Sequence, residues 1–290
     1  KEMVGRTPDD IIAYRPMKDG VIADYRVTEA MLRYYMRKAT DWWSLFRPDV
    51  MISVPAGVTS AERRAVIEAA VKAGAKTAQV VKEPILAAIG AGIPIHEAQG
   101  HMIVDIGGGT TEISVISLGG VVTWKTMRLA GNELDNNIIQ YVRDEFNILI
   151  GEQVAENIKL KIGSATPLKE PMEMEVRGRD LINGLPKQII INNTQIREAM
   201  ARTIEKIVAD IKITLETTPP ELVSDIYEHG ITLTGGGSLL RGLDKEIAQA
   251  TKIPVRAAED PLTCVVRGAG ILLSDFELLE KVVSPGTEEL

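Results

Sequence analysis

The 290-residue chain has one cysteine, three histidines and no long apolar run. Cys264 alone excludes an intramolecular disulfide framework, and the scattered histidines complete no cluster at structural-zinc spacing. So little cysteine is typical of a reducing, cytoplasmic setting. No apolar stretch reaches the roughly 18 residues that a membrane span requires, so we expect no transmembrane segment.

Basic residues are also in deficit, because 33 Lys and Arg stand against 40 Asp and Glu, a formal net charge of −7. This balance argues against a wholesale nucleic-acid binder, which usually has a basic surplus or stripe. With 45% hydrophobic and 25% charged residues and 25 glycines, the composition is that of a globular protein rather than a collagen-like or disordered one. At roughly 150 residues per domain, one large core or two ordinary ones can form.

Helical and strand patterns alternate along most of the chain, which predicts an α/β fold. In the first part, a capping-box spacing between Thr59 and Glu62 marks a helix start, and Gly74 suits a helix end. Strand, helix, strand and helix then follow one another with short joints, as in a parallel sheet. The expected elements here are helix Val27–Lys38, strand Val50–Val54, helix Ala61–Ala73, strand Gln79–Val81 and helix Ile85–Ala91.

From His101 the pattern changes to a β-hairpin, because the strand Met102–Ile106 is followed by a glycine turn and a second period-two segment at Thr111–Val115. Strand material continues to Met127. Candidate strands at Glu173–Val176 and Gln188–Ile191 indicate a small inserted α/β subdomain. The remaining expected elements are helices Leu134–Phe146, Gly151–Ile162, Thr194–Leu215 and Leu239–Ala250, strands Ile231–Thr234 and Pro254–Val255, and a closing helix after Pro261.

The hairpin turn Gly107-Gly108-Gly109-Thr110 exposes backbone N–H groups without any Cβ, and such concavities bind anions. It is neither a Walker A loop nor a dinucleotide fingerprint, because no helix follows. Asp105, at the strand end, could hold Mg²⁺ directly or through water. An ordinary glycine-rich hairpin with a capping Asp explains the pattern about equally well.

A second triple glycine, Gly235-Gly236-Gly237-Ser238, follows the buried strand Ile231–Thr234. We expect a helix to begin near Leu239, so that bare amides and a helix N-terminus face a ligand together. A strand-to-helix turn that merely needs glycine is a serious alternative.

Three further features have both a functional and an ordinary interpretation. Glu83, before Pro84, could orient a water for attack on a γ-phosphate, or it is a solvated residue at a helix start. Glu156 and Lys159 share one helix face and could hold a ribose and an adenine edge, or they form a surface ion pair. A loop with four large apolar residues suits a membrane interface better than burial in the core; these are Trp42, Trp43, Leu45 and Phe46, next to Arg47.

Taken together, the segments resemble the MreB family of bacterial actin homologues over nearly all 290 residues. The motifs that carry the resemblance are Val104–Glu112, Leu233–Gly237, Asp260–Val265, Arg15–Asp24, Glu175–Arg179 and Pro219–Leu222, with Glu83-Pro84 upstream. It implies an α/β, actin-like (ribonuclease H-like) two-domain ATPase fold with a nucleotide cleft. The implied division is 1–92 for the remainder of domain I, 93–164 for the first part of domain II, 165–192 for the inserted subdomain, 193–258 for the rest of domain II and 259–290 for helices returning to domain I.

The resemblance also implies roles for particular residues. Glu83 and Thr110 resemble the pair that positions the attacking water, and Asp105 the residue that holds Mg²⁺. ATP would lie against three segments: the second phosphate loop with Gly107, Gly108, Gly109 and Thr110; the ribose and base segment with Glu156, Asn157, Ile158 and Lys159; and the adenosine segment with Gly235, Gly236, Gly237, Ser238 and Leu239. Leu45 and Phe46 match the family's membrane loop, to which this chain adds Trp42 and Trp43.

The implied function is ATP-dependent polymerisation into membrane-associated filaments that guide peptidoglycan synthesis and keep rod shape. The expected location is cytoplasmic and membrane-associated. The expected partners are other copies of the chain, the inner face of the cytoplasmic membrane, RodZ and the MreC/MreD elongation proteins, and no nucleic acid. An Hsp70-like chaperone or a sugar kinase would share the cleft and is the alternative. No Asp-x-Gly-Thr hairpin, the family's first phosphate loop, precedes Arg15, so we expect domain I to lack its first strands.

Overall fold

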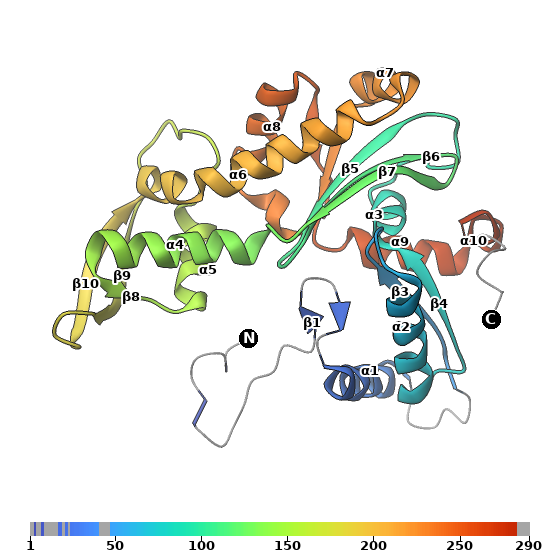
Figure 1. Cartoon of the computed structure of the whole chain (residues 1–290), viewed down its shortest axis with the longest axis horizontal. Coiled ribbons are helices and arrows are strands. Elements are labelled where there is room, and N and C mark those ends of the chain that lie inside the picture. Colours follow the sequence, from blue (N-terminus) through green and yellow to red (C-terminus); the bar gives the residue numbers. More distant parts are fainter. Residues whose placement is uncertain are drawn as a thin grey trace.

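The computed structural model describes residues 3, 7–8, 17–18, 21–22, 24–40 and 47–282 (Figure 1). The helices are α1 (Tyr25–Ala39), α2 (Ser60–Ala73), α3 (Glu83–Gly90), α4 (Gly131–Phe146), α5 (Glu152–Ile162), α6 (Asn193–Glu216), α7 (Pro220–His229), the 3₁₀ helix η1 (Gly236–Leu239), α8 (Leu243–Thr251), α9 (Cys264–Ser274) and α10 (Phe276–Val282). The strands are β1 (Met17–Lys18), β2 (Val21–Ile22), β3 (Asp49–Val54), β4 (Thr77–Lys82), β5 (His101–Ile106), β6 (Thr111–Ser117), β7 (Gly120–Met127), β8 (Ile148–Leu149), β9 (Glu173–Asp180), β10 (Pro186–Asn192), β11 (Ile231–Thr234) and β12 (Val255–Ala257).

The largest sheet has five strands in the order β12-β11-β5-β6-β7. The first three strands are parallel, and β6 and β7 continue the sheet as antiparallel hairpins, as the glycine turn after β5 predicts. Thr234 at the end of β11 pairs in register with Asp105 at the end of β5. The two triple-glycine segments therefore leave the sheet side by side, at the carboxyl edge where α/β proteins bind ligands.

Strand β5 is buried along its whole length and presents opposite faces to two hydrophobic clusters. Met102, Val104 and Ile106 pack with residues of α4, α5, α6 and α8, whereas Ile103 packs with α3 and α9 on the other face (Figure 1). A continuous apolar run is what a strand covered on both sides requires. The burial of one fully enclosed isoleucine contributes roughly 1.5–3 kcal/mol.

Helices α3 and α9 pack so closely that glycine is required at their crossing. A Cβ on Gly90 would lie 1.8 Å from the carbonyl oxygen of Cys264, and one on Gly268 would lie 1.9 Å from that of Leu86. This contact joins the chain around residue 90 to its C-terminal part. It also fixes the position of Glu83, the first residue of α3.

Strands β3 and β4 form a separate parallel pair joined by α2, as the alternating pattern predicts. The Thr59 hydroxyl accepts from the N–H of Glu62, and the Glu62 carboxylate accepts from the N–H of Thr59, so the predicted capping box is confirmed. Gly74 ends the helix at φ +120°. Within the described residues, no helix has the length and apolar character needed to cross a bilayer.

Antiparallel strands β10, β9 and β8 form a third sheet beside α4 and α5, and the candidate strands at Glu173 and Gln188 lie in it. Four elements lie outside the sequence-based expectations, namely the short strands β1, β2 and β8 and helix α7. Pro219-Pro220 predicts a break, but the second proline occupies the first turn of α7, where its missing N–H has no helical partner to lose.

Candidate functional site

A cleft of about 830 Å³ opens at the carboxyl ends of β5 and β11. Its lining comes from the start of α3, the two glycine turns, the first turn of α4, α5 and the segment before α9. Ten of the residues singled out from the sequence line it: Glu83, Asp105, Gly107, Gly108, Glu156, Lys159, Gly235, Gly236, Gly237 and Leu239.

The other predicted site residues lie elsewhere. Gly109 and Thr110 complete the first glycine turn, in which the Gly107 N–H donates to the Thr110 carbonyl over 2.9 Å. The side chain of Ile158 is buried in the hydrophobic core, and Asn157 is exposed. Ser238 is buried and its hydroxyl donates to the Gly235 carbonyl over 2.6 Å. The predicted membrane-loop residues Trp42, Trp43, Leu45 and Phe46 lie outside the described residues.

The first glycine turn is held against the start of α4 by backbone hydrogen bonds. Gly131 N–H donates to the Gly107 carbonyl over 3.1 Å, and Asn132 N–H donates to the Gly108 carbonyl over 2.7 Å. A Cβ on Gly108 would have its nearest neighbour, Asn132, at 3.5 Å, which is ordinary contact. The fold therefore tolerates a side chain at Gly108, whereas a ligand approaching this backbone would not.

The second glycine turn is required by the packing of the sheet edge. Gly235 has φ +78°, and a Cβ there would lie 2.4 Å from Oδ1 of Asp105. A Cβ on Gly237 would lie 2.3 Å from Cγ2 of Ile106. These glycines let the end of β11 approach the end of β5 at the cleft.

The segment after the second glycine turn corrects one expectation. An α-helix does not begin near Leu239; Gly236–Leu239 is a single 3₁₀ turn, and α8 begins at Leu243. The chain reverses between them at Gly242, whose φ of +73° suits glycine and where a Cβ would lie 2.1 Å from the Thr166 hydroxyl oxygen. The amides beside the cleft therefore belong to a tight turn, not to the N-terminus of a long helix.

Three neighbouring carboxyl groups have raised pKa values. Glu83 and Asp105 line the cleft, whereas Glu112 does not. Burial raises the pKa of Glu83 to about 7, and the negative charges of Asp105 and Glu112 add to the effect. Burial also raises the pKa of Asp105 to about 6. Burial raises the pKa of Glu112 to about 7, although hydrogen bonds from Ala56 N–H and the Thr126 hydroxyl oppose the rise.

These carboxylates repel one another, so a bound cation would be stabilised. Among the described residues, no group of three or more metal-ligating side chains has the geometry to hold a metal ion by itself. The carboxylate of Asp105 lies beside the first glycine turn. This arrangement fits Mg²⁺, which usually takes one or two carboxylates together with phosphate oxygens and water.

Lys159 joins α5 to the start of α4 beside the first glycine turn. Its Nζ lies 2.8 Å from Oδ1 of Asp135 and donates to the Gly131 carbonyl over 2.8 Å. Both charged side chains are only 12% exposed. Lys159 therefore forms a largely buried ion pair with Asp135, a residue that sequence reasoning missed.

Glu112, the other carboxylate missed from the sequence, had a detectable signal. It is an acidic residue within β6, a strand that is otherwise continuously buried. Such a residue either has dedicated hydrogen-bond partners or belongs to a functional site. Asp135 had no comparable signal, because an acidic residue in the first turns of a helix is common.

A five-stranded sheet covered by helices on both faces, with paired glycine turns at a cleft on its edge, matches an actin-like fold. The structure of MreB5 of Spiroplasma citri bound to ADP aligns with a TM-score of 0.90 and 39% identity, covering 94% of this chain and 82% of that one. MreB5 of the same organism bound to AMPPNP aligns with a TM-score of 0.91. The MamK double helical filament aligns with a TM-score of 0.76 at 24% identity and supports the fold alone.

The sequence relatives are more specific. The chain is 51% identical over 280 residues to the cell shape-determining protein MreB of Escherichia coli (strain K12), covering 96% of this chain and 80% of the relative. It is 45% identical over 281 residues to the cell shape-determining protein Mbl of Bacillus subtilis (strain 168), covering 97% and 84%. A family model described as MreB/Mbl protein matches residues 1–281. The chain belongs to the MreB/Mbl family, and these relatives do not favour a chaperone or a sugar kinase.

Proposed function

We propose that the protein binds ATP in the cleft and polymerises into membrane-associated filaments that determine cell shape by guiding peptidoglycan synthesis. The observation that carries the proposal is the pairing of β5 with β11, which places both glycine turns at one edge of the sheet. The proposal is supported by relatives named cell shape-determining proteins and by neighbours bound to ADP and AMPPNP.

Each wall of the cleft has a distinct role in this proposal. The Gly107–Gly109 turn borders the phosphates, and the N–H groups of Gly108 and Gly109 would hold phosphate oxygens because no side chain obstructs them. The Gly107 N–H is already bonded to the Thr110 carbonyl. Gly235 to Leu239 borders the adenosine, with Glu156 and Lys159 at the ribose and base. Mg²⁺ bound near Asp105 would neutralise charge on the phosphates.

Glu83 is the proposed residue that positions the attacking water, with Thr110. Glu83 is the first residue of α3 and lines the same cleft as the phosphate turn. Phosphoryl transfer depends mainly on such positioning and on charge neutralisation. A pKa of about 7 lets Glu83 hold or release a proton near neutral pH.

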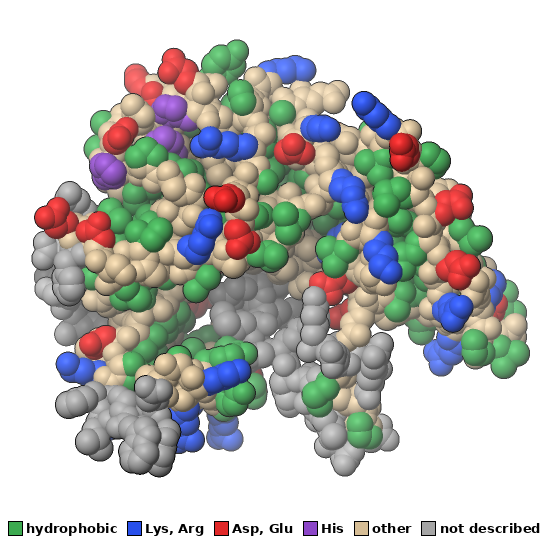
Figure 2. Space-filling view, turned by 180° about the vertical axis from the view of Figure 1, so that it is seen from behind, with side chains coloured by type: hydrophobic (Ala, Val, Ile, Leu, Met, Phe, Trp, Pro, Cys, Tyr) green, Lys and Arg blue, Asp and Glu red, His purple; other side chains and the backbone are tan. Residues whose placement is uncertain are grey.

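Membrane association is supported by the exposed face of α1. In the sequence this helix directly precedes the aromatic loop, which contains Trp42, Trp43, Leu45 and Phe46. Tyr34 is 61% exposed and Tyr35 is 59% exposed, with Arg37 and Lys38 exposed beside them. No acidic residue of α1 is exposed, because Glu29 is half-buried and pairs with Arg33. Basic side chains gather at the end of the molecule formed by α1 and α2 (Figure 2, lower left). Aromatic and basic side chains together suit an anionic bilayer surface.

Sedimentation with liposomes in the presence of ATP tests this function. We expect the protein to pellet with anionic liposomes and to form filaments visible by electron microscopy. The proposal would be contradicted if the protein stays in the supernatant and forms no filaments, whether or not ATP is present. Attachment to RodZ and the MreC/MreD proteins is part of the proposal and needs separate binding measurements.

A further inference from the structure

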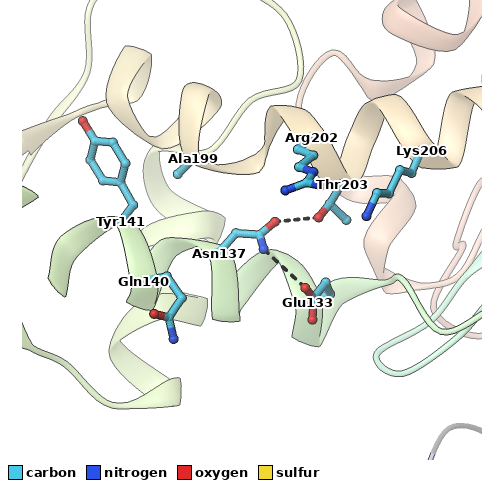
Figure 3. Close-up of a pocket in the computed structure, with 8 residues that line it drawn as sticks. All are labelled: Glu133, Asn137, Gln140, Tyr141, Ala199, Arg202, Thr203 and Lys206. Carbon is cyan, nitrogen blue, oxygen red and sulfur yellow. Dashed lines mark hydrogen bonds between the residues drawn. The ribbon is translucent and has the colours of Figure 1, made fainter. Parts of the chain in front are cut away.

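A second hollow, of about 400 Å³, lies between α4 and α6, and none of its lining residues lines the nucleotide cleft. Helix α4 contributes side chains at spacings of four, seven and eight, and α6 at spacings of three, four and seven, so each set lies on one helix face. Ala199 leaves space where a larger side chain would close the hollow. The lining is Glu133, Asn137, Gln140 and Tyr141 from α4, and Ala199, Arg202, Thr203 and Lys206 from α6 (Figure 3).

The floor of the hollow is held by one hydrogen bond between the helices and one within α4. The Thr203 hydroxyl donates to Oδ1 of Asn137 over 2.6 Å, and Nδ2 of Asn137 donates to Oε1 of Glu133 over 3.4 Å. Figure 3 shows both bonds meeting at the Asn137 amide, and the bond to Thr203 crosses from α4 to α6. The polar floor is thus pre-organised, which lowers the entropic cost of binding.

Two basic side chains lie above this floor without a partner. Arg202 and Lys206 extend from α6 toward α4 (Figure 3), and neither forms an ion pair or hydrogen bond with the part of the chain that the structure describes. Asp210, one turn after Lys206, is bonded to Lys125 over 2.7 Å. Like charges four residues apart on a helix destabilise it slightly, so helix stability does not explain the pair.

We propose that this hollow binds an acidic peptide segment of a partner protein. A carboxylate of the peptide would pair with the fork of Arg202 and with Lys206, since Arg binds carboxylates through two parallel hydrogen bonds. The Glu133 carboxylate would accept from a backbone N–H of the peptide, and the Gln140 amide would donate to a backbone C=O. Free phosphate fits less well, because Glu133 would repel its double negative charge.

The position of the hollow gives this binding a consequence. Glu133 stands in the first turn of α4 between Asn132 and Leu134, which both line the nucleotide cleft. A partner held here would attach next to the cleft without entering it. The proposal does not depend on ATP binding, so its test is separate from that of the proposed function.

Fluorescence anisotropy with the full chain tests the proposal, using a fluorescein-labelled peptide of alternating glutamate and serine as the probe. Arg202→Gln with Lys206→Gln is expected to weaken binding at least tenfold, and Ala199→Leu, which fills the hollow without a change of charge, by a similar factor. Lys212→Gln is the matched control, because Lys212 is exposed on the same helix outside the hollow and the affinity should be unchanged. Thermal unfolding verifies that each variant is folded.

Three results would overturn the proposal. The first is wild-type affinity in the Arg202 and Lys206 double variant or in the Ala199 variant. The second is equal binding of a glutamine–serine peptide, which would remove the carboxylate from the recognition. The third is displacement of the peptide by inorganic phosphate at equal concentration, which would identify a site for free anions instead.

Discussion

The backbone N–H of Ala56 donates to Oε2 of Glu112 over 3.3 Å, linking the loop after β3 to the middle of the five-stranded sheet. The other carboxylate oxygen accepts from the Thr126 hydroxyl over 3.1 Å. Nearby, a Cβ on Gly57 would lie 2.5 Å from the Trp124 ring. Glu112 therefore connects the β3–β4 part of the molecule to the sheet that carries the phosphate turn. The charge of Glu112 affects its hydrogen bond with Ala56 and raises the pKa of the Glu83 carboxyl group.

The first prediction concerns pH. Because burial raises the pKa of Glu112 from 4.5 to about 7, the folded state holds a proton that the unfolded state releases. Stability from this group is complete below pH about 4.5 and is lost as pH rises through about 7. Without nucleotide, the protein should unfold at a higher temperature at pH 5.5 than at pH 8. Glu112→Gln should remove on the order of 1–2 kcal/mol of that difference, measured by calorimetry at both pH values. An unchanged pH dependence would contradict the assignment.

Gly235→Ala tests the close approach of the two strand ends. The new methyl group would meet Asp105 and the Ile106 carbonyl, and φ +78° is strained for alanine. We expect a loss of about 1–3 kcal/mol in the free energy of unfolding, measured by urea denaturation. Gly151→Ala is the matched control, since a Cβ there would have no atom within 4 Å and its φ is −90°. Equal effects of the two substitutions would argue against the steric account.

Lys159→Met removes the charge that compensates Asp135. Because both side chains are 12% exposed, the carboxylate would remain largely buried without its partner. The expected cost is about 3 kcal/mol in unfolding free energy, the lower end for a buried pair because both side chains keep some exposure. We also expect weaker ADP binding at the proposed ribose side. Adding Asp135→Leu should restore most of the stability but not the ADP affinity. If the double variant is no more stable than Lys159→Met, the ion pair does not explain the loss.

The exposed face of α1 gives a prediction about lipid. Replacing Tyr34 and Tyr35 with Ser and Arg37 and Lys38 with Gln should reduce binding to anionic liposomes by at least tenfold and leave unfolding unchanged, since all four side chains are exposed. A second variant with Ser at Trp42, Trp43, Leu45 and Phe46 tests the aromatic loop separately. Liposome flotation that is unaffected in the α1 variant would limit the membrane contact to other residues.

Much of the fold could be predicted from the sequence because local patterns determine it. The hairpin after β5 follows from a period of two that resumes directly after the glycine turn, and the start of α2 follows from the capping box at Thr59. The 3₁₀ turn after Gly235 could not be predicted, because the reversal at Gly242 depends on its contact with Thr166, far away in sequence. The partners of Glu112 and Asp135 are also distant in sequence, namely Ala56 and Thr126 for Glu112 and Lys159 for Asp135. Glu112 was nevertheless detectable as an acidic residue in an apolar strand, whereas Asp135 was not.

Titration calorimetry of ATP with Mg²⁺ tests the central claim, that the cleft at the ends of β5 and β11 holds the nucleotide through its bare phosphate turn. Gly108→Val is the variant to compare with the unmodified chain, because a Cβ there has ordinary contacts within the fold but would project beside the turn. We predict that the unmodified chain binds ATP and that Gly108→Val binds it at least tenfold more weakly while unfolding at a similar temperature. Equal affinity of the two proteins, or no binding by either, would contradict the account.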